Sequence, residues 1–210
     1  MNEQWIQAPK IDGNQELAAQ FHVSPMAMRL IRSRAGESEA EVRAYLYGTL
    51  EDLADARLMK GMTEAVELLR QKIRVGATIR IIGDYDIDGV NATHILVTGL
   101  RRVGAQVDTV IPDRLKDGYG INEHLIEQAK EAGIDTIVTC DNGIAAAKEI
   151  AYAKELGMTV IVTDHHEIPY REEENGTRTT ILPPADVIVN PKQADCPYPY
   201  KKLCGAAVAW

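Results

Sequence analysis

The sequence predicts an α/β fold, in which a mostly parallel sheet carries helices on both faces and follows a small helical N-terminal region. From Gly76 onward, short β-branched segments alternate with amphipathic segments of helix length. Gly104, Gly133 and Gly157 each follow one of these helical segments, at the position where a left-handed residue closes a helix. The chain has 210 residues, of which 45% are hydrophobic, so it can bury a full core. This rhythm of strands and helices is typical of parallel sheets.

The predicted helical region covers residues 1–75. Apolar residues recur at helical spacing around Leu17 and again around Leu30. Residues 39–53 and 62–73 are two further candidates for amphipathic helices. Nothing in this region suggests chemistry, and we expect it to serve packing.

The second region, residues 76–210, is predicted to hold the sheet. Short segments rich in β-branched residues predict strands over residues 78–82, 106–111, 135–139, 158–163 and 186–189. The segments between them predict helices over residues 90–103, 123–132 and 145–156. Residues 168–184 are polar and contain proline, which predicts a loop, and Cys204 begins a final apolar helix.

Acidic residues and histidines stand directly after three of the predicted strands. In chain order they are Asp84, Asp86, Asp88, Asp141, Asp164, His165 and His166. Parallel sheets bind ligands beyond the carboxyl ends of their strands, so these side chains are expected to meet at one edge. Carboxylates packed closely repel one another, and a divalent cation removes that penalty. A mixed carboxylate and imidazole shell suits Mn²⁺ or Mg²⁺.

The number of candidate ligands favours a pair of ions over a single one. Two ions a few ångströms apart stabilise both the attacking and the leaving oxygen of an in-line phosphoryl displacement. The sequence therefore predicts phosphoryl-transfer chemistry at this edge of the sheet.

Two other interpretations fit part of this pattern. Asp84, Asp86, Asp88 and Gly89 have the spacing of the first half of an EF-hand calcium loop, but Ile95 stands where a bidentate Glu is required. The same loop after a strand is similar to the aspartyl-nucleophile loop of haloacid-dehalogenase-type phosphatases. That second interpretation leaves the paired histidines unexplained.

Three further residues are candidate substrate contacts. Arg114 and Tyr119 follow the second strand within the run 113–120, and they could bind a phosphate and stack on a base, respectively. A glycine-rich turn with a solvated arginine explains the same run equally well. Asn190 ends the last strand, where it either orients a ligand or forms the turn before Pro191.

Composition excludes several classes of protein. The formal net charge of −8 lacks the basic footprint of a general DNA-coating protein, although it permits an enzyme with one nucleic-acid cleft. No apolar run approaches the roughly 18 residues of a membrane span, and the N-terminus does not read as a secretory signal. Three cysteines, Cys140, Cys196 and Cys204, offer neither a disulfide framework nor zinc spacing, which favours a reducing, cytoplasmic setting.

The motifs together resemble those of the DHH phosphoesterase superfamily and, within it, the RecJ group of bacterial single-strand-specific exonucleases. The resemblance rests on residues 84–89, 141–143, 164–166, 190–191 and 204–206, which follow one another in the order of the family's motifs. It extends to the run 113–120 and to the helical lead-in, and so covers essentially the whole chain. It implies a parallel-sheet DHH phosphoesterase domain.

The resemblance also implies an activity and roles for residues. It implies hydrolysis of single-stranded DNA from a 5′ end with Mn²⁺ or Mg²⁺, in DNA repair and recombination. Asp86, Asp88, Asp141 and His165 match metal-ligand positions of the family, and Asp84 is a further ligand or an orienting acid. Asp164 would hold an imidazole. His166 would contact the scissile phosphate or assist the leaving group.

Two departures from the family pattern limit what the resemblance implies. Asn91, Ala92 and Thr93 stand where these nucleases usually begin a helix with several hydroxyl residues. The family's last metal-binding Asp and its second domain lie beyond Trp210. We therefore expect a fragment, truncated at the C-terminal end, with weak or no activity of its own.

Two alternatives to the nuclease remain open from the sequence. The same site could act on a small substrate, such as an oligoribonucleotide, a cyclic dinucleotide or pyrophosphate. The fold could also serve as a non-catalytic scaffold, although every acid and histidine of the matching motifs is present. A helicase or a single-strand-binding protein is a conceivable partner that the sequence does not specify.

Overall fold

A computed structural model describes residues 12–115, 118–173 and 176–210 of the chain. The chain divides into two compact units, with the boundary between Leu53 and Ala54. Each unit has its own hydrophobic core.

The first unit is helical, as the sequence predicts. Its elements are α1 (Asn14–Gln20), α2 (Pro25–Ala35), α3 (Glu39–Tyr47) and the short 3₁₀ helix η1 (Leu50–Asp52). Ser24 and Ser38 begin α2 and α3 by accepting backbone N–H groups with their side chains. Apolar residues from all three α-helices and from the C-cap of α1 form the core: Ala18, Phe21, Met28 and Val42.

The single helix predicted over residues 39–53 is wrong in its second half. Gly48 adopts an extended conformation at the end of α3, and the chain then forms only the single turn of η1. The apolar spacing of this segment did not reveal that interruption.

The second unit is built around a five-stranded parallel sheet. The strands are β1 (Thr78–Ile82), β2 (Gln106–Val110), β3 (Thr136–Cys140), β4 (Thr159–Thr163) and β7 (Val187–Val189). Their order across the sheet is β2-β1-β3-β4-β7. The chain leaves β1 toward β2 on one side and later continues to β3 on the other. A switch of this kind is where parallel sheets bind ligands.

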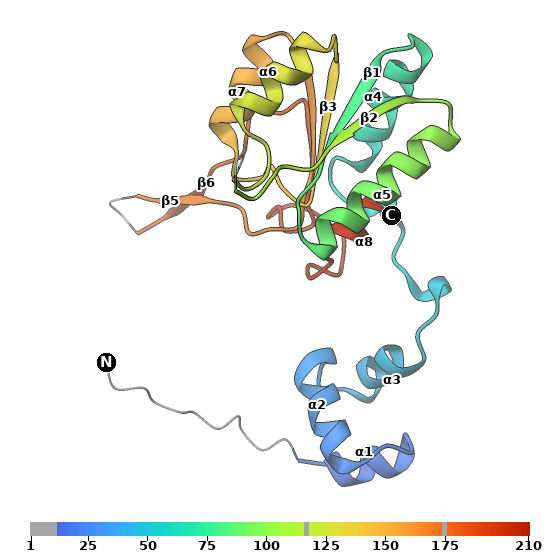
Figure 1. The fold of residues 1–210 in the computed structure, drawn as a ribbon. Helices are drawn as coiled ribbons and strands as arrows, with labels where there is room; N and C mark the ends of the chain where they lie inside the picture. The colour runs from blue at the N-terminus through green and yellow to red at the C-terminus, as the bar shows by residue number, and fades with distance from the viewer. Residues whose placement is uncertain (1–11, 116–117, 174–175) are drawn as a thin grey trace. The chain divides into compact units, whose positions relative to one another are not determined.

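Helices cover both faces of the sheet (Figure 1). On one face lie α4 (Met62–Arg74), α5 (Ile87–Arg102) and α8 (Gly205–Ala209), and on the other lie α6 (Glu123–Glu131) and α7 (Ala147–Glu155). A single-turn 3₁₀ helix, η2 (Ala56–Leu58), precedes α4. All five residues of β3 are buried, because β3 lies at the centre of the sheet with helices on either side. The α/β fold with helices on both faces is thus confirmed.

The compact unit begins earlier than the sheet. The sequence places the change from helices to alternating strands and helices at residue 76, whereas the structure divides the chain at residue 54. The difference arises because α4 packs on the sheet: Ala65 is buried in the same core cluster as Ile79, and Leu69 packs against that cluster.

Most element boundaries in this unit agree with the prediction to within a few residues. Gly104, Gly133 and Gly157 have φ values of +85°, +72° and +76°, so the left-handed conformation predicted for each is confirmed. Helix α5 begins three residues before the predicted Val90, because the side chain of Asp86 caps it.

The loop predicted over residues 168–184 contains a small hairpin. Strands β5 (Tyr170–Glu172) and β6 (Arg178–Thr180) pair antiparallel and project from the sheet (Figure 1). Every residue of both strands is exposed, and Arg178 lies over the ring of Tyr170. A hairpin without a buried face shows no period-2 hydrophobic pattern, so this one could not be predicted from apolar spacing.

Across the described ranges, none of the helices combines the length and the apolar character that crossing a membrane requires.

Candidate metal centre

The loop after β1 is shaped by the beginning of α5. Asp86 Oδ1 accepts the backbone N–H groups of Asp88 and Gly89 at 2.8 and 2.9 Å, so Asp86 is the N-cap of the helix. Asp84 lies before the cap and is only 2% exposed. A Cβ at Gly89 would come within 2.6 Å of Asp84, so only glycine lets the helix begin this close to the acid.

Asp88 reaches from the first turn of α5 to α8. Its two carboxylate oxygens accept the backbone N–H groups of Gly205 and Ala206 at 2.6 and 2.8 Å. Cys204, the N-cap of α8, makes no side-chain hydrogen bond to the helix, so Asp88 takes the place of a capping side chain. The first motif and the last motif of the sequence are thereby joined.

Asp141 stands at the end of β3 in the left-handed region, with φ of +61°. Asp is one of the few residues with a side chain that occupies this region readily. The next residue, Asn142, is buried and donates to the carbonyl oxygens of Ile82 and Cys140. These bonds fix the end of β3 against β1 and hold Asp141 at the edge of the sheet.

Asp164 organises the loop after β4. Its Oδ1 accepts the backbone N–H groups of His165 and His166 at 2.7 and 3.1 Å and lies 2.7 Å from His166 Nδ1. Its Oδ2 accepts the backbone N–H of Ile144 at 2.9 Å. Asn190, at the end of β7, donates from Nδ2 to the carbonyl oxygen of His166 at 3.1 Å. Both histidines are therefore set by buried polar contacts.

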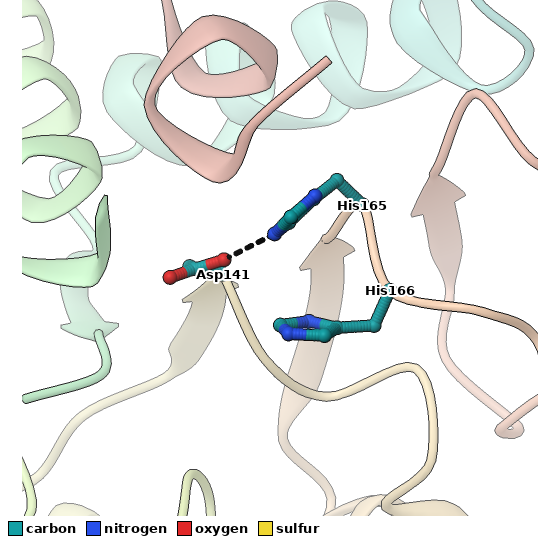
Figure 2. A group of neighbouring side chains, drawn as sticks. All are labelled: Asp141, His165 and His166. Carbon is teal, nitrogen blue, oxygen red and sulfur yellow. Dashed lines mark ion pairs between the residues drawn. The ribbon is translucent and has the colours of Figure 1, made fainter. Parts of the chain in front are cut away.

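The predicted ligands converge on Asp141. Figure 2 shows His165 and His166 extending from the loop after β4 toward Asp141 at the end of β3. His165 Nε2 lies 2.9 Å from Asp141 Oδ1 and 3.5 Å from Asp88 Oδ2.

Within the described ranges, two groups of side chains offer ligand atoms that lie within 4.8 Å of one another. Asp141, His165 and His166 form one group, and Asp84, Asp86 and Asp141 form the other. Asp141 belongs to both groups. Each group can hold one divalent ion, and the carboxylate of Asp141, with two oxygens, can bridge the pair.

Burial and mutual repulsion perturb the carboxylates of this cluster. Burial, together with the charge of Asp88, raises the pKa of Asp141 to about 7. Burial also raises the pKa of Asp84, and the charge of Asp86 adds to the rise. A neighbouring cation would favour the ionised form of both groups, because an opposite charge at close range offsets desolvation.

Three other groups are held in their charged forms. Burial opposes ionisation of Asp164, but hydrogen bonds from the His166 ring and from the backbone N–H of Ile144 outweigh it and lower the pKa. The hydrogen bond between the His166 ring and Asp164 also raises the pKa of His166. For Asp88, burial is outweighed by the backbone N–H groups of α8, and its pKa is lowered.

Unsatisfied oxygens support a metal in this cluster. Among the described residues, Asp84 Oδ1 and Asp141 Oδ1 are buried and have no hydrogen-bond partner. Asp141 Oδ1 faces His165 Nε2 at 2.9 Å without hydrogen-bond geometry. Two atoms bound to one ion at about 2.1 Å and roughly a right angle lie about 3 Å apart, so this spacing fits a shared ligand sphere. Oxygen and imidazole donors without a thiolate suit Mn²⁺ or Mg²⁺.

The three candidate substrate contacts lie in different environments. The Arg114 guanidinium lies over the ring of Tyr85 at 5.3 Å, and the ring of Tyr119 meets the rings of both Tyr85 and His166 edge to face. Tyr119 also donates to the backbone carbonyl oxygen of Asp141 at 3.1 Å. Residues 116 and 117, in the same predicted run, lie outside the described residues.

Asn190 differs from the other two because it is fully buried. Its Nδ2 holds His166, and its Oδ1 accepts the backbone N–H of Lys192 at 2.8 Å. The side chain therefore positions the histidine loop, and a direct contact with substrate is not open to it in this arrangement.

A match to a family profile decides the class of this protein. Residues 78–210 match the profile described as "DHH family, N-terminal domain". The chain belongs to the DHH family. Solved structures of relatives share this parallel-sheet fold.

The curated relatives of this DHH-family chain share the name RecJ. The chain is 42% identical over 205 residues to the single-stranded-DNA-specific exonuclease RecJ of Bacillus subtilis, covering 98% of this chain and 25% of that protein. It is 35% identical over 202 residues to the RecJ of Escherichia coli, covering 96% of this chain and 32% of that protein. The chain thus spans between a quarter and a third of the length of these relatives.

Two solved structures resemble this DHH-family fold. An exonuclease RecJ bound to manganese superposes with a TM-score of 0.60 at 40% identity, over 72% of this chain and 36% of that one. RecJ from Thermus thermophilus in complex with Mn²⁺ gives a TM-score of 0.62 at 31% identity, over 97% of this chain and 26% of that one.

Some residues of this DHH-family site escape sequence reasoning. The sequence points to Asp88 as a ligand but not to its bonds with α8, and it assigns Asn142 no task. One signal was available: a helix that begins at Cys204 and Gly205 has no capping oxygen of its own, so its N–H groups need an acceptor from elsewhere. For the inward orientation of Asn190 the sequence offers no comparable signal.

Proposed function

We propose that this chain carries the two-metal centre of a phosphodiesterase that hydrolyses single-stranded DNA from a 5′ end and releases mononucleotides. The single observation that carries the proposal is the pair of ligand groups that share Asp141. Two adjacent ions are the arrangement that suits in-line displacement at phosphorus. The RecJ relatives, named as single-stranded-DNA-specific exonucleases, support the substrate.

The ligands proposed for the two ions are the acids and histidine that the sequence singles out. Asp84 and Asp86 would hold one ion, Asp88 and His165 would hold the other, and Asp141 would serve both, which leaves His166 for the leaving group. Asp88 approaches His165 and keeps α8 at the edge of the site. Bound Mn²⁺ or Mg²⁺ supplies Lewis-acid stabilisation of the phosphoryl oxygens and lowers the pKa of a coordinated water.

His166 is proposed to act on the leaving group. Its Nδ1 is bonded to the buried carboxylate of Asp164, which stabilises the charged imidazolium. The ring is half exposed, and Nε2 points away from Asp164, 3.4 Å from the hydroxyl of Tyr119. Nε2 can therefore hold a proton for the leaving oxygen of the scissile phosphate while Asp164 fixes the orientation of the ring.

Substrate contacts are proposed for Arg114 and Tyr119. Arg114 offers a planar guanidinium that can donate two hydrogen bonds to one phosphate. Tyr119 is half exposed and stands beside His166, so its ring can contact a base next to the reacting phosphate. For Asn190 we propose a positioning role.

We further propose that this activity serves DNA repair and recombination in the cytoplasm. The three cysteines are free, which fits a reducing compartment. A helicase or a single-strand-binding protein as partner stays a prediction.

A Mn²⁺ assay at high protein concentration tests the proposal. Its substrates are 5′-labelled single-stranded DNA, the same strand in a duplex, a short RNA and a cyclic dinucleotide. We expect slow release of mononucleotides from single-stranded DNA, none after Asp141→Asn, and an unchanged rate after Asp195→Asn, a substitution in an exposed surface ion pair. Faster cleavage of the RNA or the cyclic dinucleotide would assign a small substrate instead.

A further inference from the structure

A cleft of about 550 Å³ opens beside the metal centre. Asp164 and His166 line one end of it, so it is continuous with the site of the proposed reaction. Its volume lies in the range of roughly 300–1,000 Å³ that small-molecule sites occupy. Of the residues given roles above, Tyr119, Asp164 and His166 line the cleft, whereas the residues proposed to hold the metal ions do not.

The walls of the cleft suit a flat, mostly apolar group. Tyr119, Ile121, Ile144 and Ala145 contribute an aromatic ring and aliphatic surface. Ile121 and Ile144 are held almost fully buried behind that surface, so the walls are backed by the core. An aromatic ring and aliphatic surface are the kinds of wall against which a planar ring packs well.

One charged group faces the cleft from α7. Glu149 lines it and is partly exposed, and no hydrogen bond or ion pair to its carboxylate is found within the part of the chain that the structure describes. A free carboxylate accepts hydrogen bonds and repels anions, so it disfavours a phosphate and favours a neutral group with N–H donors.

We infer that this cleft binds an unpaired nucleobase next to the scissile phosphate, with Glu149 accepting an N–H of its pairing edge. This inference rests on the proposed function, because the base enters attached to the phosphate at the metal centre. Every one of the four bases carries an N–H donor on its pairing edge, so the contact tolerates any sequence. In a duplex the partner strand already uses those donors and the base is stacked, so the cleft selects for single strands.

Methyl NMR of the metal-free chain tests the inference without requiring hydrolysis. The probes are deoxycytidine and thymidine, with 2-deoxyribose as the control that lacks a base. We expect both nucleosides to shift the methyl resonances of Ile121 and Ile144 in a saturable manner, and we expect 2-deoxyribose to leave them in place. Shifts of equal size with the sugar, or none with the nucleosides at tens of millimolar, would overturn the inference.

Substitutions in the cleft test whether the nucleosides bind there. Ala145→Phe fills the cleft from an exposed position, so we expect it to abolish the shifts; Ala132→Phe, at an exposed position after α6, leaves them unchanged. Glu149→Gln keeps the shape and replaces the carboxylate with a weaker acceptor, so the apparent Kd rises about three- to tenfold. Retention of full nucleoside binding by Ala145→Phe contradicts the assignment.

Failure of the nucleobase inference and failure of the proposed nuclease function give different results. Nucleoside binding together with faster cleavage of the RNA or the cyclic dinucleotide than of single-stranded DNA would support the cleft and refute the DNA nuclease. Hydrolysis of single-stranded DNA without nucleoside shifts at Ile121 and Ile144 would support the nuclease and refute the cleft.

Discussion

Asp164 is the residue on which the histidine loop depends. It is 1% exposed, and its two oxygens receive three backbone N–H groups and one imidazole nitrogen. A carboxylate accepts all of these bonds, whereas an amide of the same size presents an NH₂ group to some of the same donors.

Asp164→Asn should therefore destabilise the protein. We expect the free energy of unfolding to fall by about 3 kcal/mol, since buried N–H donors lose a charged acceptor. Urea denaturation of the metal-free protein measures the loss. Asp195→Asn, at an exposed carboxylate paired with Lys60, should leave the stability close to that of the wild type. Equal stability of the two variants would show that the Asp164 contacts contribute little.

The pair formed by Asp164 and His166 should make stability depend on pH. The hydrogen bond to Asp164 raises the pKa of His166 above its ordinary value of 6.5. Stability from the charged imidazole is thus fully present below pH 6.5 and is lost as pH rises through the raised folded value. The unfolding free energy of the metal-free wild type should exceed that of His166→Gln most in acid and least in alkali.

A double-mutant cycle provides the control for this pH trend. In an Asp164→Asn background, His166→Gln should no longer alter the pH dependence, because the group that raises the pKa is gone. A trend that persists in that background would have another source.

Individual residues show where sequence reasoning succeeds and where it stops. The carboxyl ends of parallel strands must meet, so the convergence of Asp141 and His165 follows from their places after two strands. The burial of Asn190 does not follow, since a residue at a strand end can face either solvent or the neighbouring loop. That choice is made by the carbonyl of His166, which no local pattern reveals.

At the scale of elements, the docking of α8 completes the site. Asp88 caps its first turn, and Gly205 lies against Asp141, where an added Cβ would come within 2.5 Å of Oδ1. The cap could be inferred only in part, because α5 and α8 are more than a hundred residues apart in the chain. Their contact is a property of the folded unit.

Two Gly→Ala substitutions should have opposite effects. Gly205→Ala forces α8 away from Asp141, so we expect a loss of about 1–3 kcal/mol in stability together with weaker Mn²⁺ binding. Gly99→Ala, inside α5 with open space around the new Cβ, should stabilise by about 0.5–1 kcal/mol and leave Mn²⁺ binding unchanged. Thermal unfolding and calorimetric titration with Mn²⁺ measure both effects. Unchanged Mn²⁺ affinity in Gly205→Ala would show that the position of α8 does not affect metal binding.

At the scale of the whole molecule, the sheet and α4 belong to one compact unit with a shared core. The sequence predicts where the sheet begins but not that α4 belongs to its core, because an amphipathic helix can bury its apolar face against many partners. The structure resolves that choice through Leu68, Leu69 and Ile73, which pack against the cluster around Ile79.

Truncated chains should show where the second compact unit begins. A chain that begins at Ala54 keeps α4, so we expect cooperative unfolding with a midpoint close to that of the second unit in the full chain. A chain that begins at Gly76 loses α4 and should be destabilised by several kcal/mol, since each buried Leu or Ile contributes about 1.5–3 kcal/mol. Denaturation followed by circular dichroism compares the two. Similar stability of both truncated chains would place α4 outside the unit.

The central claim is that Asp141 joins two divalent ions. The most direct measurement is anomalous diffraction at the manganese edge from crystals of the 210-residue chain grown with Mn²⁺. We predict two peaks about 3.5–4 Å apart, one on each side of the Asp141 carboxylate, and the loss of both in Asp141→Asn. A single peak that Asp141 does not touch, or peaks that survive the substitution, would contradict the account.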